Sequence, residues 1–387
     1  MNVNLIFKKP FHTDVVLLYP NQEDLFRKYV FREIPFQTID VGSWICLHPS
    51  ILFRTLKLLI SIKLNIKPSL IIKDIYEKHL QAYIESIEPK VVITFIDDSG
   101  VFHRLSRNCH SSYFMAIQNG MRPNCYFKYL LPKYPNRGSL TSMTNYFCHG
   151  TGDIESFRSR GHKIDNYFPI GSLVGGVYWK EISQKAEQVY DICYISSWVS
   201  TEKKPSPDNT DAMNYYLADT KASEVLEKNI KKLIAENKYS VIVALKYDSS
   251  KEEMEYFYSI FGDSVEYQSA DKNNFSTYKA IDKSQMTLTT YSTCAAEALG
   301  IGKRALFANG SGDDSITIKE SGFCSFEGSS YPDFRQKINK ILNLTDREYS
   351  NEMNDARKKL MNYDLSELPH DKLYTIIKNN LDNRDRG

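Results

Sequence analysis

Residues 278–312 read YKAIDKSQMTLTTYSTCAAEALGIGKRALFANGSG, and this stretch decides the fold. The threonine-rich run Met286–Tyr291 predicts a β-strand, and Arg304–Ala308 predicts a second strand that is buried. Between them, Ser292–Thr293 can cap a helix that Gly300–Gly302 then ends. The order strand, turn, helix, strand is that of a parallel α/β unit.

The turn between this strand and this helix has the features of an anion-binding site. The first N–H groups of a helix have no partner inside it, and the helix dipole makes that end positive. Ser292 and Thr293 add two hydroxyl groups there, and Glu297 lies one turn further along. We expect Glu297 to face the same cleft; in the alternative interpretation it is solvated and the helix end is an ordinary cap.

The length of 387 residues exceeds that of one typical domain, and we expect two domains, at residues 1–180 and 181–387. Apolar residues make up 42% and charged residues 25%, as in globular proteins with complete cores. The net charge of +2 is too small to indicate nucleic acid as a partner.

The seven cysteines are scattered, odd in number and never arranged as C-x-x-C. This pattern disfavours a disulfide framework and a zinc site, and it favours a reducing compartment. The opening residues lack the pattern of a signal peptide, and no apolar stretch is long and uncharged enough to predict a membrane-spanning helix. We therefore expect a cytoplasmic protein.

Strands alternate with helices along most of the chain, which predicts parallel, doubly wound sheets. In the first half we expect strands at Asp14–Leu18, Gln37–Val41, Val91–Ile96, Tyr113–Ile117, Tyr146–His149 and Tyr167–Gly171. The helices expected there are Ile75–Ile87, Val101–Asn108 and Ile154–Arg160, and we expect Asp74 to cap the first of them. In the second half we expect strands at Tyr190–Ser196 and Ser240–Leu245, helices at Ser223–Asn237 and Lys251–Phe261, and a polar loop at Ser200–Thr210.

One predicted helix, Ile51–Ile66, is apolar but carries basic residues. They are Arg54, Lys57 and Lys63, and Lys67 and Lys73 follow in the sequence. We expect this helix to pack in a core or between domains, with its basic side chains reaching outward to solvent. In the alternative interpretation it rests on an anionic membrane surface.

Several pieces of the sequence resemble a bacterial family of surface carbohydrate biosynthesis proteins. These pieces are VVITFIDDSGVFHRLS, MAIQNGMR, YFCHGTGDIESF, FPIGSLVGG, DICYISSW and the stretch 278–312. The last of them also resembles the donor-binding motif S-T-x-x-x-E-A-x-x-x-G of GT-B glycosyltransferases, matched by Ser292, Thr293, Glu297, Ala298 and Gly302. More distantly, the chain is similar to teichoic acid glycerophosphotransferases and to retaining β-Kdo transferases.

This resemblance implies a GT-B-like α/β fold, in which two Rossmann-like domains with parallel sheets face a central cleft. The N-terminal domain is then the acceptor side and the C-terminal domain binds the nucleotide-sugar. The helix at Asp371–Leu381 resembles the terminal helix that crosses back to the first domain. The implied activity is transfer of a sugar from a nucleotide-activated donor to a growing surface glycan such as O-antigen or capsule.

For the donor, the resemblance implies that Ser292 and Thr293 hold the phosphate and that Glu297 binds the ribose. Lys246, expected at the end of a strand in the second domain, is a second candidate for the phosphate, and its alternative is a solvated strand end. The donor nucleotide is left open between CMP, UDP and GDP. The acceptor is a glycan, with or without a lipid carrier.

Catalysis needs an acid–base group near the anomeric carbon. Candidates follow strands of the first domain, where Asp97 and Asp98 end one strand and His149 and Glu155 flank the turn after another. The alternatives are helix capping for one of the aspartates and helix-dipole stabilisation for Glu155. Acceptor or carboxylate binding falls to Gln118, Asn119 and Arg122, since a guanidinium matches carboxylate geometry. In the alternative interpretation Arg122 is an ordinary surface arginine.

One residue departs from the family pattern. In the teichoic acid transferases the turn after the corresponding strand reads W-H-G, and this chain has Asn119 at the histidine position. An amide cannot accept the proton, which disfavours glycerophosphate transfer. Two alternatives to a glycosyltransferase stay open. One is a catalytically inert scaffold subunit, which Asn119 favours, and the other is a nucleotide-sugar epimerase or hydrolase on the same fold.

No metal and no cofactor is expected. The sequence has no D-x-D motif between a strand and a turn, and no G-x-G-x-x-G follows the early strands, which disfavours a pyridine nucleotide. The expected partners are therefore the donor and the acceptor, and not nucleic acid. Peripheral contact with the cytoplasmic face of the inner membrane stays open, because it depends on the basic helix described above.

Overall fold

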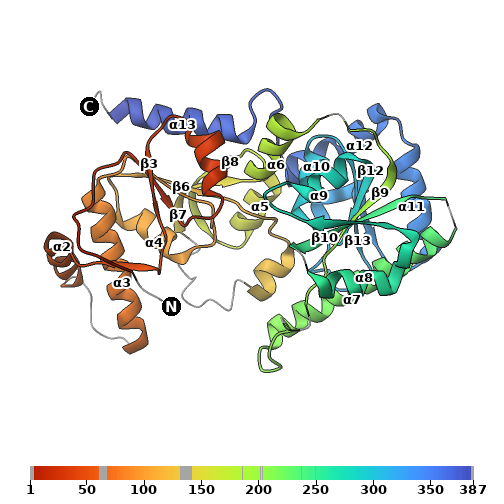
Figure 1. Cartoon of the computed structure of the whole chain (residues 1–387), viewed down its shortest axis with the longest axis horizontal. Helices are drawn as coiled ribbons and strands as arrows, with labels where there is room; N and C mark the ends of the chain where they lie inside the picture. Colours follow the sequence, from red (N-terminus) through yellow and green to blue (C-terminus); the bar gives the residue numbers. More distant parts are fainter. Residues whose placement is uncertain are drawn as a thin grey trace.

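The computed structural model describes residues 4–60, 68–130, 142–184, 186–200, 202, 204–236, 238–248 and 250–384. Within them, two six-stranded sheets lie side by side along the long axis of the molecule, each with helices packed against it (Figure 1). Every strand pair of both sheets is parallel, as the alternation of strands and helices predicted.

The N-terminal sheet has the order β3-β2-β5-β6-β7-β8. Its strands are β2 (Val15–Leu18), β3 (Phe36–Ile39), β5 (Val91–Thr94), β6 (Tyr113–Ile117), β7 (Ser142–Cys148) and β8 (Lys163–Pro169). Its helices are α2 (Pro49–Leu59), α3 (Pro68–Ile87), α4 (Gly100–Asn108) and α5 (Thr151–Ser159). Successive residues of a strand point to opposite faces, so Val15 and Leu17 enter one core while Val16 and Leu18 enter another.

The C-terminal sheet has the order β11-β10-β9-β12-β13-β14. Its strands are β9 (Tyr190–Ile195), β10 (Val241–Asp248), β11 (Glu266–Ala270), β12 (Ser284–Thr289), β13 (Arg304–Asn309) and β14 (Ser325–Glu327). Its helices are α7 (Thr210–Ala235), α8 (Lys251–Phe261), α9 (Ser276–Asp282), α10 (Thr293–Gly300), α11 (Tyr331–Asn343) and α12 (Asp346–Leu360). In strand order along the chain this is 3-2-1-4-5-6, the order of the Rossmann fold.

Between β8 and β9 the chain forms the short helix α6 (Leu173–Val177) and a π-helical turn, Tyr178–Ile182. The last helix, α13 (Pro369–Arg384), then packs against the N-terminal half (Figure 1). Leu373 and Ile377 of α13 are buried in the same core as Val15 and Ile93, and the Lys90 ammonium donates to the Leu381 carbonyl at 3.3 Å. The first and last parts of the chain therefore share one hydrophobic core.

Four local predictions were wrong. Helix α3 begins at Pro68, so Asp74 lies inside it and is not its cap; proline is favoured in the first turn because its missing N–H needs no partner there. Helix α7 begins at Thr210, well before Ser223, because Ala218 and Ala222 continue its buried face.

The other two concern the second sheet. Lys246 lies within β10, which continues to Asp248, and not after its end. Ser292 does occupy the N-cap position of α10, but its side chain makes no capping hydrogen bond. Of the predicted apolar helix, Pro49–Leu59 is helical, whereas residues 61–67, with Lys63 and Lys67, lie outside the described residues.

We expect Gly150 to be essential for the contact between the two halves. A Cβ atom at this position would lie 2.0 Å from the Lys359 carbonyl oxygen of α12, whereas one at Gly120 would meet nothing closer than 3.6 Å. Gly150→Ala should therefore lower the free energy of unfolding by roughly 1–3 kcal/mol, and Gly120→Ala, the control, should not. Urea unfolding followed by circular dichroism measures both, and equal stability of the two variants would contradict the close packing.

Candidate functional site

A pocket of about 420 Å³ opens where the carboxyl ends of the strands of both sheets meet. From the N-terminal half it is lined by residues that follow β2, β5 and β6, namely Gln22, Phe95 and Asn119. Residues at the ends of β9, β10 and β12 line it from the C-terminal half, among them Ser196, Ser197, Lys246, Ser292, Thr293 and Glu297. Its volume is within the usual range for small-molecule sites.

The topology explains why the pocket is there. In each sheet the strand order reverses at one point, between β2 and β5 in the first sheet and between β9 and β12 in the second. At such a point the loops leave the sheet toward opposite sides and open a crevice beyond the strand ends. The pocket lies beside both reversal points.

Helix α10 presents its N-terminus to this pocket. Ser292 and Thr293 are both half-buried and line it, and Thr293 also accepts a hydrogen bond from the Met121 N–H at 3.1 Å. The Ser292 side chain makes no hydrogen bond to the N–H groups in the first turn of this helix. The predicted arrangement of two hydroxyls at a helix N-terminus is therefore present, and one hydroxyl contacts the other domain.

Glu297 lines the pocket from the second turn of α10, yet only 1% of its surface is exposed. Its carboxylate accepts hydrogen bonds from the Ser172 hydroxyl, just before α6, and from the Tyr278 hydroxyl at 2.7 Å. Burial raises the pKa of Glu297 to about 7, and these two hydrogen bonds oppose that shift. The Cys294 side chain and the Gly175 N–H oppose the same shift, so a ligand hydroxyl that binds Glu297 would replace one of these partners.

Lys246 lines the pocket with an exposed side chain whose ammonium donates to the Trp198 carbonyl at 3.2 Å. Its backbone N–H is held by the carboxylate of Glu253 at 2.9 Å, and the same carboxylate accepts from the Ser196 hydroxyl at 2.6 Å. Sequence reasoning missed Glu253, since an acid in the first turn of a helix gives no sign that it faces a neighbouring strand end. It fixes the ends of β9 and β10.

Asp97 lies behind the pocket. It is buried at the end of β5 and forms an ion pair with Arg122 at 2.5 Å. The same carboxylate accepts from the Tyr146 hydroxyl at 3.0 Å and from the Asn119 N–H at 3.2 Å. Burial raises the pKa of Asp97, and the charge of Arg122 opposes this rise. Asp97 thus holds the turn 118–122 in place.

A second group of polar residues surrounds a much smaller crevice of about 30 Å³ on the other side of this turn. His149 lies there with its Nε2 atom 3.2 Å from the Gln118 carbonyl, and Gln118 donates to Asp153 at 3.2 Å. Burial and the charge of Arg122 lower the pKa of His149 to about 3, whereas burial raises the pKa of Asp153 to about 7. The imidazole is therefore neutral at pH 7 and a weak base.

The remaining candidate acids lie apart from each other. Asp98 follows Asp97 at the carboxyl end of the first sheet and is half-buried, and Glu155 is exposed on α5. Neither residue lines the pocket or the crevice. Of the predicted residues, Lys246, Ser292, Thr293, Glu297 and Asn119 therefore share the pocket. Sequence reasoning missed Asp153 as a site residue. The available signal was its position directly after the turn Gly150–Thr151–Gly152.

Within the described residues, no group of three or more His, Cys, Asp and Glu side chains is arranged to hold a metal ion. The described helices also include none that is both long enough and apolar enough to cross a bilayer. All seven cysteines are free thiols.

Residues 115–380 match the model of a family described as "putative O-antigen biosynthesis protein". Since the match covers more than half of the chain, the chain belongs to this family. The resemblance to surface carbohydrate biosynthesis proteins that the sequence showed is thereby confirmed. No curated protein matches the sequence.

Solved structures with the same fold cover almost the whole chain. The UDP-bound MnaA of S. aureus is 14% identical, with a TM-score of 0.54 over 95% of each chain. A UDP-N-acetylglucosamine 2-epimerase is 15% identical, with a TM-score of 0.53 over 96% of this chain and 95% of the other. A variant of the wall teichoic acid polymerase TagF is 9% identical, with a TM-score of 0.50 over 97% and 91%. At such identities the likeness establishes the fold alone, and the GT-B-like expectation is confirmed.

The raised pKa of Glu297 makes a prediction about stability and pH. A carboxyl group that holds its proton more tightly in the folded state than in the unfolded state loses stability as pH rises. This loss begins near its ordinary pKa and is complete above about 7. Glu297→Gln keeps a hydrogen-bonding group but cannot ionise, so its melting temperature relative to wild type should be higher at pH 8 than at pH 5. A difference that does not change with pH would show that Glu297 titrates normally.

Proposed function

We propose that the chain is a glycosyltransferase that moves a sugar from a nucleotide-activated donor to a growing surface glycan such as O-antigen. The observation that carries this proposal is the 420 Å³ pocket between the two domains. Membership of the O-antigen biosynthesis family supports the biological role. The division of the chain at residue 180, into an acceptor-side and a donor-side domain, is part of the same proposal.

In this proposal the donor diphosphate lies at the N-terminus of α10. The N–H groups of its first turn, the hydroxyl of Ser292 and the ammonium of Lys246 bind its oxygens and offset the charge that grows as the nucleotide leaves. Glu297 accepts a hydrogen bond from the ribose at the bottom of the pocket. UDP is the first nucleotide to test, because the MnaA structure of the same fold contains UDP.

The acceptor glycan approaches from the N-terminal domain, whose Gln22 and Asn119 line the pocket. Arg122 is engaged by Asp97 behind this wall, so we assign it a positioning role instead of direct contact with a carboxylate. Asp98 is our candidate for the group that takes the proton of the acceptor hydroxyl. It is the less buried of the two acids that follow β5.

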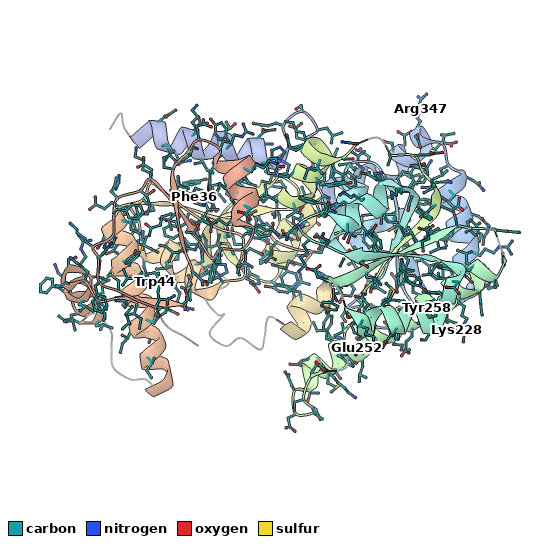
Figure 2. The ribbon with its side chains drawn as sticks, viewed as in Figure 1. Phe36, Trp44, Lys228, Glu252, Tyr258 and Arg347 are labelled. Carbon is teal, nitrogen blue, oxygen red and sulfur yellow. The ribbon has the colours of Figure 1, made fainter. Side chains whose placement is uncertain are left out.

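The donor site predicts selective nucleotide binding. In a thermal-shift panel of UMP, UDP, CMP, CDP, GDP and dTDP, we expect one nucleotide to raise the melting temperature, because it binds only the folded state. Lys246→Ala should weaken that nucleotide roughly tenfold through loss of one charge-assisted contact, and Glu297→Ala should weaken it too. Lys228→Ala is the matched control, since this exposed lysine lies on α7 away from the pocket (Figure 2).

The outcome of this panel separates the candidate functions. Binding that is lost in Lys246→Ala but kept in Lys228→Ala supports the donor site. If the donor is then consumed without an acceptor, the chain is an epimerase or hydrolase, as similar folds in the epimerases allow. No response to any of the nucleotides, in wild type or variants, would favour the scaffold function that Asn119 suggested.

The two aspartates at the end of β5 should differ in their effects. Asp98→Asn should reduce turnover of the identified donor by roughly 10²–10⁴-fold, because it removes the acid–base group, and leave donor affinity unchanged. Asp97→Asn should mainly lower the melting temperature, since it leaves Arg122 buried without its counter-ion. Full turnover by Asp98→Asn would reject this assignment and direct attention to Glu155 and His149.

A further inference from the structure

Exposed apolar side chains are concentrated in the first 75 residues of the chain. Of thirteen large apolar residues that are exposed in the described part of the chain, nine lie between residues 5 and 75. They are Leu5, Phe7, Phe11, Leu52, Phe53, Leu56, Ile60, Ile72 and Ile75. Single exposed apolar residues are ordinary, but a contiguous group marks an interaction surface.

Helix α2 carries the central part of this group. Leu52, Leu56 and Ile60 follow one another at intervals of four residues, so they lie along one side of the helix, with Phe53 beside them. Their exposure is high, 61% for Leu56 and 85% for Ile60. The core-facing side of the helix is a different one, formed by the buried Ile51. Helix α2 therefore has one apolar face in the core and a second apolar face toward solvent.

Helix α3 adds two further exposed apolar side chains. It packs against α2, since the Thr55 hydroxyl lies 3.2 Å from the ring of His79 and the Arg54 guanidinium donates to the Glu85 carbonyl at 3.3 Å. Ile72 and Ile75 are exposed in the first half of α3. Both helices lie at the end of the molecule away from the C-terminal sheet (Figure 1).

A small parallel sheet adjoins the start of α2. Its strands are β1 (Asn4–Ile6) and β4 (Trp44–Cys46), and the chain stays paired beyond them, since the Leu47 N–H donates to the Ile6 carbonyl at 2.6 Å. Trp44, labelled in Figure 2, fastens this sheet to α3 by packing its ring 4.4 Å from that of Tyr83. Exposed Leu5 and Phe7 are therefore held beside α2.

Helix α2 and the residues around it are basic up to Asp74, the first acid after this helix, which lies between Ile72 and Ile75. From residue 41 to residue 73 the sequence contains no Asp or Glu, although it contains Arg54, Lys57 and Lys73. On α2, Arg54 and Lys57 are exposed next to the apolar stripe, and Lys8 and Lys9 are exposed after β1. Apolar side chains flanked by basic residues fit the boundary of a bilayer that carries anionic headgroups.

We propose that the surface formed by Leu52, Phe53, Leu56, Ile60, Ile72 and Ile75, here called the α2 surface, docks the chain on an anionic lipid bilayer. The apolar side chains enter the interface and the basic residues contact the headgroups. The use of this surface rests on the proposed function, because docking brings the acceptor-side domain to a lipid-linked acceptor. The binding itself does not depend on it.

The test is sedimentation of the full chain with vesicles, without nucleotide or acceptor. Wild type should bind vesicles of phosphatidylglycerol and phosphatidylethanolamine and not those of phosphatidylcholine alone, and added salt should weaken binding. Leu56→Glu should reduce the bound fraction roughly tenfold, since it places a carboxylate in the interface. Leu365→Glu is the matched control, because Leu365 is 62% exposed in the C-terminal half and gains the same charge.

Two further measurements keep the outcomes distinct. Equal vesicle binding by Leu56→Glu and Leu365→Glu, or no binding by wild type, would overturn the proposal. A wild-type dimer in light scattering that Leu56→Glu converts to monomer, with no vesicle binding, would identify the α2 surface as a contact between two copies instead. Both variants should keep the wild-type melting temperature and nucleotide response, so a failure of the proposed donor site is detected separately.

Discussion

The buried ion pair between Asp97 and Arg122 fixes the position of the turn 118–122, and the arrangement of the two domains depends on that turn. Each charge in such a pair has lost its hydration, so the pair is stable only while the surrounding groups keep it in register. Tyr146 and the Asn119 N–H supply this support. Within this turn, the Met121 N–H donates to the Thr293 hydroxyl. Thr293 lies at the N-terminus of α10, the helix that we assign to the donor phosphate.

A second connection passes through the chain segment between the domains. The Ser172 hydroxyl, at the start of α6, donates to Glu297 inside the pocket, and the Asn362 N–H donates to the His149 carbonyl at 2.8 Å. Glycines at positions 171 and 300 let the ring of Tyr363 pack against the backbone beside this joint. Glu297 therefore both lines the pocket and joins the two halves of the chain.

Much of the architecture could be predicted from the sequence, because a buried parallel strand is a short run of apolar residues that are neighbours in the chain. The run VVITFI and the run YFMAI consist of residues that favour strands, and both are bounded by turn residues. Helix ends were harder to predict: α3 begins at Pro68 and α7 at Thr210, and the side chain of Asn209 before α7 makes no capping hydrogen bond that would mark its start. The sequence also places Lys246 at a strand end, because the apolar run VIVAL stops before it, although β10 continues past it.

The sequence by itself determined the fold class and the strand–turn–helix at Ser292 and Thr293, to which we assign the donor phosphate, because both follow from residues that are neighbours in the chain. Only the tertiary structure decided which acids are already paired. Asp97 is separated from Arg122 by 25 residues and Glu297 from Ser172 by 125, and no local pattern records such contacts. The same holds for the exposed apolar side of α2. The sequence of an apolar helix does not show whether one face or two are buried, and only the packing against α3 shows which side is exposed to solvent.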